Sequence, residues 1–168
     1  AFVAIAEDDD KQHYLAGATF GPVDLDSTSE SFVGATACTN NAAEASAIAW
    51  ASVWMLAVRK SAKVVFHMDS TTTGGHFSCQ QLVQVNAAQI HLLQSLRLAV
   101  ESKHSAVWTH VRAHSGAPWN ELADGLCTHA MGGARSRVPT GLRSLAAQPE
   151  HAAWLWVLLL SDEARLAL

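Results

Sequence analysis

The stretch Lys63-Val64-Val65-Phe66-His67-Met68-Asp69 decides the fold class of this 168-residue chain. It is short, rich in β-branched residues and closed by an acid, and long patterns of helical spacing lie on both sides of it. A short apolar run between breakers, followed by a helical pattern, is typical of a central parallel strand with helices on its faces. The run therefore predicts an α/β protein.

Periodicity and breaker residues predict the remaining elements. In chain order we expect strands at 1–6, 13–20 and 31–37, a helix at 40–60, the strand at 63–68, a turn at 71–75, a helix at 81–101, a strand at 106–111 and a helix at 118–131. Antiparallel hairpins followed by strand–helix alternation imply a mixed sheet flanked by helices. Residues 1–131 are expected to form the domain, and residues 132–168 a linker and a C-terminal helical tail.

Composition narrows the class of protein. Hydrophobic residues make up 49 % and charged residues 15 %, which excludes a disordered chain or a coiled coil. The longest apolar run, 152–160, is too short for a bilayer, which needs about 20 residues, so no membrane partner is expected. Three cysteines without a CxxC pair favour a reducing compartment, the cytoplasm or the nucleus. The net charge of −4 argues, read alone, against a nucleic-acid partner.

Three acidic residues stand at positions that suggest chemistry. Asp69 directly follows the predicted strand, at the carboxyl end where open α/β sheets bind ligands. Glu44 lies one turn into an alanine-rich helix, and Asp124 lies in the last predicted helix. Singly, such acids are more often turn formers or helix-dipole partners.

The three acids and their flanking residues together resemble the ribonuclease H family. The segments that carry the resemblance are Asn40-Asn41-Ala42-Ala43-Glu44, Met68-Asp69-Ser70 and His114-Ser115-Gly116-Ala117-Pro118-Trp119-Asn120-Glu121-Leu122-Ala123-Asp124. They are similar to the type 1 branch, which includes cellular and retroelement enzymes. The ten-residue step from His114 to Asp124 is the most specific part. The resemblance spans residues 1–131 and implies a ribonuclease H-like fold.

This resemblance implies endonucleolytic hydrolysis of the RNA strand of RNA–DNA hybrids. Glu44, Asp69 and Asp124 would be ligands of two Mg²⁺ ions, with Mn²⁺ as a substitute, because hard cations prefer oxygen ligands. His114 would be the fourth catalytic residue, moving a proton or helping product to leave.

Four further residues are expected, by the same resemblance, to bind substrate. Asn40 and Asn41 would contact the minor groove of the hybrid, where the 2′-OH distinguishes RNA from DNA. Ser70 and Asn120 would contact the nucleic-acid backbone or support the carboxylates. Because metal ligands make up part of the negative charge, we expect weak, metal-dependent binding with a shallow salt dependence.

The sequence departs from the family pattern at its start. The family uses four carboxylates, and the first lies on the first strand in an Asp-Gly-Ser or similar turn, which does not occur here. Residues 1–6 match the second strand better, so the first strand and its Asp are expected upstream of residue 1. Asp8, Asp9 and Asp10 are expected to form a solvated turn instead. Little nuclease activity and an open slot in the sheet follow from this alignment.

Several functions stay open on the sequence alone. The alternative to an active enzyme is a catalytically silent module that binds nucleic acid or supports an adjoining reverse transcriptase domain of a retroelement polyprotein. Two further hypotheses remain. The chain could be another member of the wider superfamily, such as an exonuclease or integrase, or an unrelated α/β protein whose acidic residues match by chance. We expect the chain to be monomeric.

Overall fold

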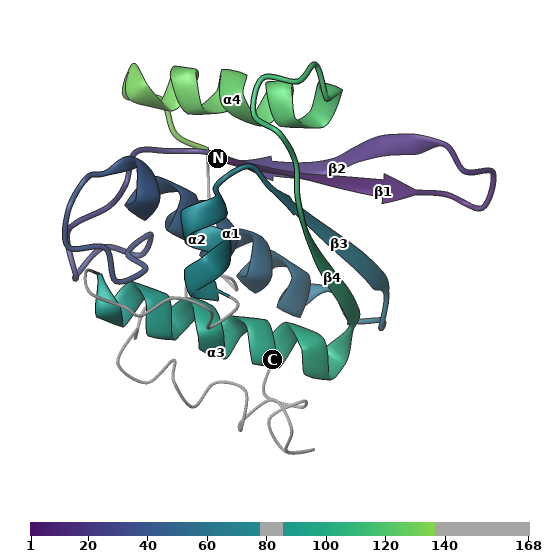
Figure 1. Ribbon diagram of the computed structural model, residues 1–168, viewed down its shortest axis with the longest axis horizontal. Helices are drawn as coiled ribbons and strands as arrows, with labels where there is room; N and C mark the ends of the chain where they lie inside the picture. The colour runs from purple at the N-terminus through teal and green to yellow at the C-terminus, as the bar shows by residue number, and fades with distance from the viewer. Residues whose placement is uncertain (78–85, 137–168) are drawn as a thin grey trace.

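The computed structural model describes residues 1–77 and 86–136. The elements in this part are β1 (Phe2–Glu7), β2 (His13–Thr19), α1 (Asn40–Ala57), β3 (Lys63–Met68), α2 (Thr71–Phe77), α3 (Ala87–Lys103), β4 (Ser105–His110) and α4 (Pro118–Met131). Helices α1 and α3 pack together on one side of the strands, and α4 lies on the other side, against β1 (Figure 1). The α/β class predicted from the sequence is confirmed.

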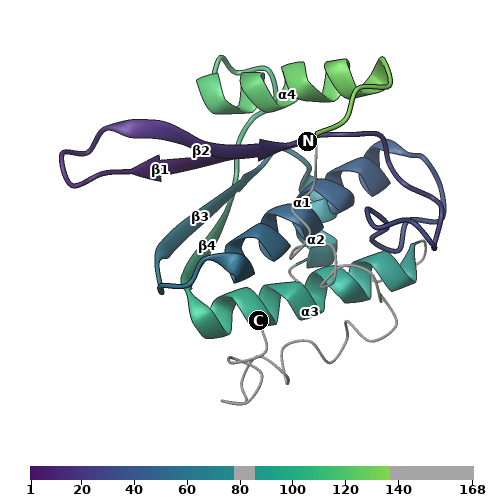
Figure 2. The ribbon, with the colours of Figure 1, turned by 180° about the vertical axis from the view of Figure 1, so that it is seen from behind.

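The strands form two separate two-stranded sheets in the described residues, and the single mixed sheet that we predicted is wrong. Strands β1 and β2 pair antiparallel, with Phe2 opposite Thr19, while β3 and β4 pair in parallel, with Phe66 opposite Trp108. Neither β1 nor β3 pairs with a second described strand, so each keeps one free edge. Both views place β1, rather than β2, on the side of β3 (Figure 2). No described strand pairs with both sheets.

The core lies between α1, α3 and one face of the β3–β4 pair. Leu92, Leu93 and Leu96 of α3 have no exposed surface, since the apolar residues of this helix recur with helical period on its inner side. Phe66 and Trp108, opposite each other in the ladder, stack with ring centroids 3.8 Å apart. This contact links β3 to β4, and Phe66 itself belongs to the buried core that the helices form.

Two local predictions were wrong. Residues 31–37 are irregular rather than a strand, because Gly34 adopts a φ of +84° and lies so close to α3 that a Cβ would meet the Gln89 backbone at 3.0 Å. Residues 71–75 belong to helix α2 rather than to a turn. Its start is capped by Ser70, whose Oγ accepts the Thr73 N–H at 3.1 Å.

Helix boundaries also differ from the prediction. Helix α1 ends at Ala57, before Arg59 and Lys60, because Val58 is already extended. The described part of the 81–101 helix begins at Ala87, and Asn86 has a left-handed φ of 53°, so a continuous helix does not cross it. The earlier part of that range and the predicted tail, 137–168, lie outside the described residues. None of the helices within 1–77 and 86–136 is long and apolar enough to cross a membrane.

Candidate active site

Three elements each present one of the predicted carboxylates. Asp69 directly follows β3, at the carboxyl end of the parallel pair, where the Val111 N–H donates to the Met68 carbonyl at 2.8 Å. Glu44 lies in the second turn of α1, and Asp124 lies in the middle of α4; both are half-buried. The predicted metal ligands therefore come from α1, β3 and α4.

These carboxylates lie within electrostatic range of one another. Burial raises the pKa of Glu44 above its ordinary value, and the negative charges of Asp69 and Asp124 raise it further. A long hydrogen bond of 3.5 Å from Asn120 Nδ2 to Asp69 Oδ2 ties α4 to the end of β3. Glu44 thus lies in the field of the other two predicted carboxylates.

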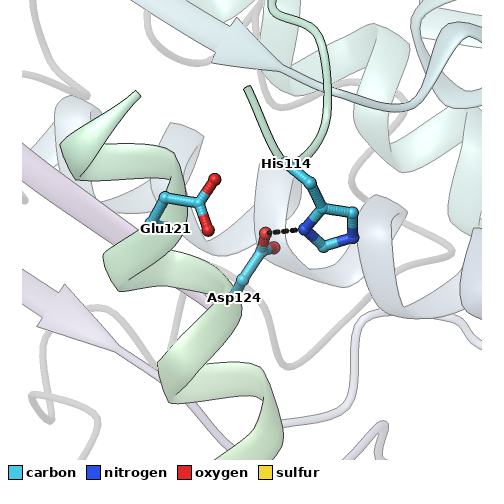
Figure 3. Close-up of side chains that lie close together, drawn as sticks. All are labelled: His114, Glu121 and Asp124. Carbon is cyan, nitrogen blue, oxygen red and sulfur yellow. Dashed lines mark ion pairs between the residues drawn. The ribbon is translucent and has the colours of Figure 1, made fainter. Parts of the chain in front are cut away.

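The tightest group of possible ligand atoms is a different set from the predicted one. His114, Glu121 and Asp124 place one ligand atom each within 4.8 Å of the others, whereas Glu44 and Asp69 belong to no such group among the described residues. Figure 3 shows both carboxylates of α4 turned toward the His114 ring. Glu121 was not predicted as a site residue, although it lies inside the segment that carries the resemblance.

The donor set is of the kind that holds a hard divalent cation. Asp124 Oδ2 is buried and accepts no well-oriented hydrogen bond from the described residues, although His114 Nδ1 lies 3.4 Å from it. An orphaned carboxylate oxygen beside further carboxylates fits Mg²⁺ or Mn²⁺, which favour oxygen ligands and offset like charge. By the resemblance, Glu44, Asp69 and Asp124 would hold such an ion, whereas the ligand atoms within 4.8 Å of one another belong to His114, Glu121 and Asp124.

His114 occupies the loop between β4 and α4. Its side chain is 80 % exposed and its backbone has a left-handed φ of 51°. Gly116 follows with a φ of +78°, so the loop turns sharply before Pro118 starts the helix. The imidazole is thus carried at the rim of the site, where solvent and a substrate can both reach it.

The predicted substrate-binding residues differ in what the fold does with them. Asn40 and Asn41 are the first two residues of α1 and are exposed, as substrate contacts need to be. Thr39 caps this helix by accepting the Ala42 N–H at 3.2 Å. The Ser70 hydroxyl, in contrast, is engaged in the α2 cap, where it also donates to Thr73 Oγ1 at 2.9 Å.

A cavity of about 210 Å³ lies beside Asn41 and was not predicted. Its polar lining consists of Thr36, Thr39, Asn41, Thr73, Asn86 and Gln89. Gln89 is fully buried, and its Nε2 donates to the Ala42 carbonyl while its Oε1 has no partner in the described part of the chain. The signals available in the sequence were an asparagine directly before a helix and a glutamine on its apolar face.

No family model matches the chain, and no curated protein or solved structure is significantly similar to it. The residues of the site and their geometry are therefore the basis for a functional assignment.

Proposed function

We propose that this protein hydrolyses the RNA strand of RNA–DNA hybrids endonucleolytically, with Mg²⁺ as its cofactor. The observation that carries the proposal is the placement of Glu44, Asp69 and Asp124, from three elements, so that burial and the nearby charges of Asp69 and Asp124 raise the pKa of Glu44. Half-buried carboxylates that converge in this way need a cation, and phosphoryl transfer is the chemistry for which such clusters are suited. Their flanking residues agree with the ribonuclease H pattern.

The roles of the side chains follow from their places. When bound, two Mg²⁺ ions would activate water for in-line attack and stabilise the leaving 3′ oxygen. Asn120 orients Asp69 through its hydrogen bond, and the Asp124 carboxylate lies 3.4 Å from the imidazole of His114. His114, exposed on its loop, would transfer a proton at the rim of the site.

The surface next to the carboxylates supplies groups for the hybrid. Asn40 and Asn41 offer amide donors and acceptors to 2′-hydroxyls, the feature that separates RNA from DNA. The cavity beside Asn41 lies at the N-terminal ends of α1 and α3, and such helix ends favour phosphate groups. A backbone phosphate of the hybrid is its proposed occupant.

The test is a binding and cleavage experiment on the whole chain. In about 5 mM Mg²⁺, we expect an RNA–DNA hybrid to bind more tightly than the matching DNA duplex. EDTA should abolish this difference. In single-turnover reactions with labelled RNA, slow cleavage should fall to background in Asp69→Asn and Asp124→Asn. Leu98→Ala, a change at an exposed position of α3, is the control and should leave binding and cleavage unchanged. Hybrid binding that is indifferent to Mg²⁺ contradicts the proposal.

A catalytically silent ribonuclease H-like module is the second candidate. Two observations favour it. Asp69 is the one carboxylate at the carboxyl ends of β3 and β4, and β1 and β3 keep free edges where the missing first strand and its carboxylate are expected. Metal-dependent binding of the hybrid without cleavage, in either Mg²⁺ or Mn²⁺, would identify this module. Cleavage that depends on Asp69 would identify the enzyme.

A further inference from the structure

The loop that carries His114 has a backbone that needs support. His114 and Gly116 both adopt positive φ, and for a non-glycine residue this conformation costs on the order of 1 kcal/mol. No atom lies within 4 Å of the position that a Cβ on Gly116 would take, so packing does not hold this part of the loop. Polar contacts have to fix its shape.

Glu121 makes the contact that fixes the far end of the loop. Its Oε1 accepts the Gly116 N–H at 3.2 Å. Helix α4 begins after Ala117, which has no side-chain oxygen to cap it; the bond from Gly116 to Glu121 resembles the backward bond of a capping box, displaced by one residue at each end. At the near end, His114 Nδ1 lies 3.4 Å from Asp124 Oδ2.

Two roles are compatible with the position of Glu121. Its carboxylate lies close enough to His114 and Asp124 to be a metal ligand, yet one of its oxygens is already engaged by the loop backbone (Figure 3). We propose that Glu121 is a positioning residue, which clamps the Gly116 amide and so holds His114 against Asp124, and that it is not a metal ligand. The effect of this contact on catalysis rests on the proposed nuclease function, whereas the contact between Glu121 and the Gly116 amide does not depend on that function.

The two roles differ in what a glutamine can replace. The amide oxygen of Glu121→Gln can still accept the Gly116 N–H, whereas Glu121→Ala offers no acceptor. A ligand to Mg²⁺ needs the carboxylate charge, so glutamine would fail there as alanine does. The conservative variant therefore separates a clamp from a ligand.

The experiment compares Glu121→Ala, Glu121→Gln and Asp124→Asn in the full chain, with Met131→Ala, which is 82 % exposed at the end of α4, as control. The first readout is amide hydrogen exchange of Gly116, measured by NMR without substrate or metal. Alanine should speed this exchange about tenfold, while glutamine and the control should not, since one hydrogen bond to a charged acceptor is lost. Exchange of the Leu96 amide, in the core, should stay unchanged in all four variants.

The second readout is Mg²⁺ affinity by calorimetry, and the third is the single-turnover rate on a hybrid. Asp124→Asn should weaken Mg²⁺ binding, whereas Glu121→Gln should not. Alanine should lower the rate about tenfold without changing the hybrid Kd, and glutamine should restore it. Unchanged Gly116 exchange in Glu121→Ala, or a glutamine variant that loses Mg²⁺ as Asp124→Asn does, overturns the proposal. If no variant cleaves, the exchange and calorimetry still decide the clamp, while the nuclease function fails on its own.

Discussion

Helices α3 and α4 are of similar length but sit in the molecule in opposite ways. Eight residues of α3 are buried, and three leucines among them have no exposed surface, whereas Ala130 is the one buried residue of α4. Yet α4 carries Asn120, Glu121 and Asp124, which take part in the contacts of the candidate site. The helix that stabilises the fold and the helix that serves the site are therefore distinct.

The difference teaches how this site is held in place. The α1–α3 layer provides a rigid base through apolar burial, which is large but gives no chemical specificity. Helix α4 is aligned to that base by a few polar contacts, in particular the one between Asn120 and Asp69. We expect mutations in α3 to act on stability, and mutations in α4 to act on binding and catalysis.

The largest contrast is expected between two leucine substitutions. Leu96→Ala in α3 should lower the free energy of unfolding by about 3 kcal/mol, because it leaves a cavity in a fully buried position. Leu122→Ala in α4, where the side chain is 37 % exposed, should cost below about 1 kcal/mol. Urea denaturation followed by far-UV circular dichroism measures both, and equal costs would remove the distinction between the helices.

The next effect concerns the contact that aligns α4 with β3. Asn120→Ala removes the donor to Asp69 Oδ2 and should weaken Mg²⁺ binding about tenfold, because a ligand loses the group that orients it. The free energy of unfolding should stay the same within about 0.5 kcal/mol, since Asn120 is only partly buried. Calorimetric titration with Mg²⁺ measures the affinity. A large loss of stability with unchanged Mg²⁺ binding would show that α4 is structural after all.

Both helices were more predictable than the irregular segment 31–37, which packs on α3. Strongly periodic segments such as α3 and the Pro118–Met131 helix were placed within the described residues with small errors, because apolar period and a proline at the first helical turn are local signals. The Ser31–Ala37 segment was misassigned because its apolar residues pack on α3 through Gly34 rather than in a sheet. That contact depends on residues more than 50 positions apart in the sequence, such as Gly34 and Gln89.

The candidate site shows the same limit. Glu44, Asp69 and Asp124 were predicted from their flanking residues, whereas the group of close ligand atoms in the described residues is His114, Glu121 and Asp124. Glu121 was overlooked because an acid in a first helical turn has an ordinary explanation, and only the Gly116 contact shows its second partner. Gln89 was overlooked because a glutamine on a helix is usually exposed, and only the fold reveals that it is buried.

A smaller loss of stability is expected at acidic pH, and it arises from a histidine at the end of α3. His104 is 4 % exposed; its Nδ1 accepts the Ala62 N–H at 3.2 Å and its Nε2 donates to the Met55 carbonyl at 3.0 Å. Burial lowers the pKa of His104 below its ordinary value, although the bond to Met55 opposes this. The unfolded chain therefore binds a proton more readily, so stability is full above about pH 6.5 and falls as the pH drops below it.

Unfolding free energies measured between pH 7.5 and pH 5 test this sign. His104→Gln should flatten the pH dependence, because the amide can keep one hydrogen bond and does not titrate in this range. His91→Gln, at an exposed position of α3, is the matched control and should keep the slope of the unaltered chain. A slope that persists in His104→Gln would assign the acid sensitivity to another group.

The smallest effect is expected at Glu44, where the two regions meet. Its pKa is raised by burial and by Asp69 and Asp124, so its ionisation opposes folding at neutral pH in the absence of metal. Glu44→Gln should therefore raise the Tm of the metal-free protein by about 2 °C at pH 7. The gain should vanish at pH 4, where the carboxyl is largely protonated, and reverse in saturating Mg²⁺, because the variant binds the ion less well. Equal Tm shifts with and without Mg²⁺ would mean that the repulsion among these carboxylates does not serve to bind a cation.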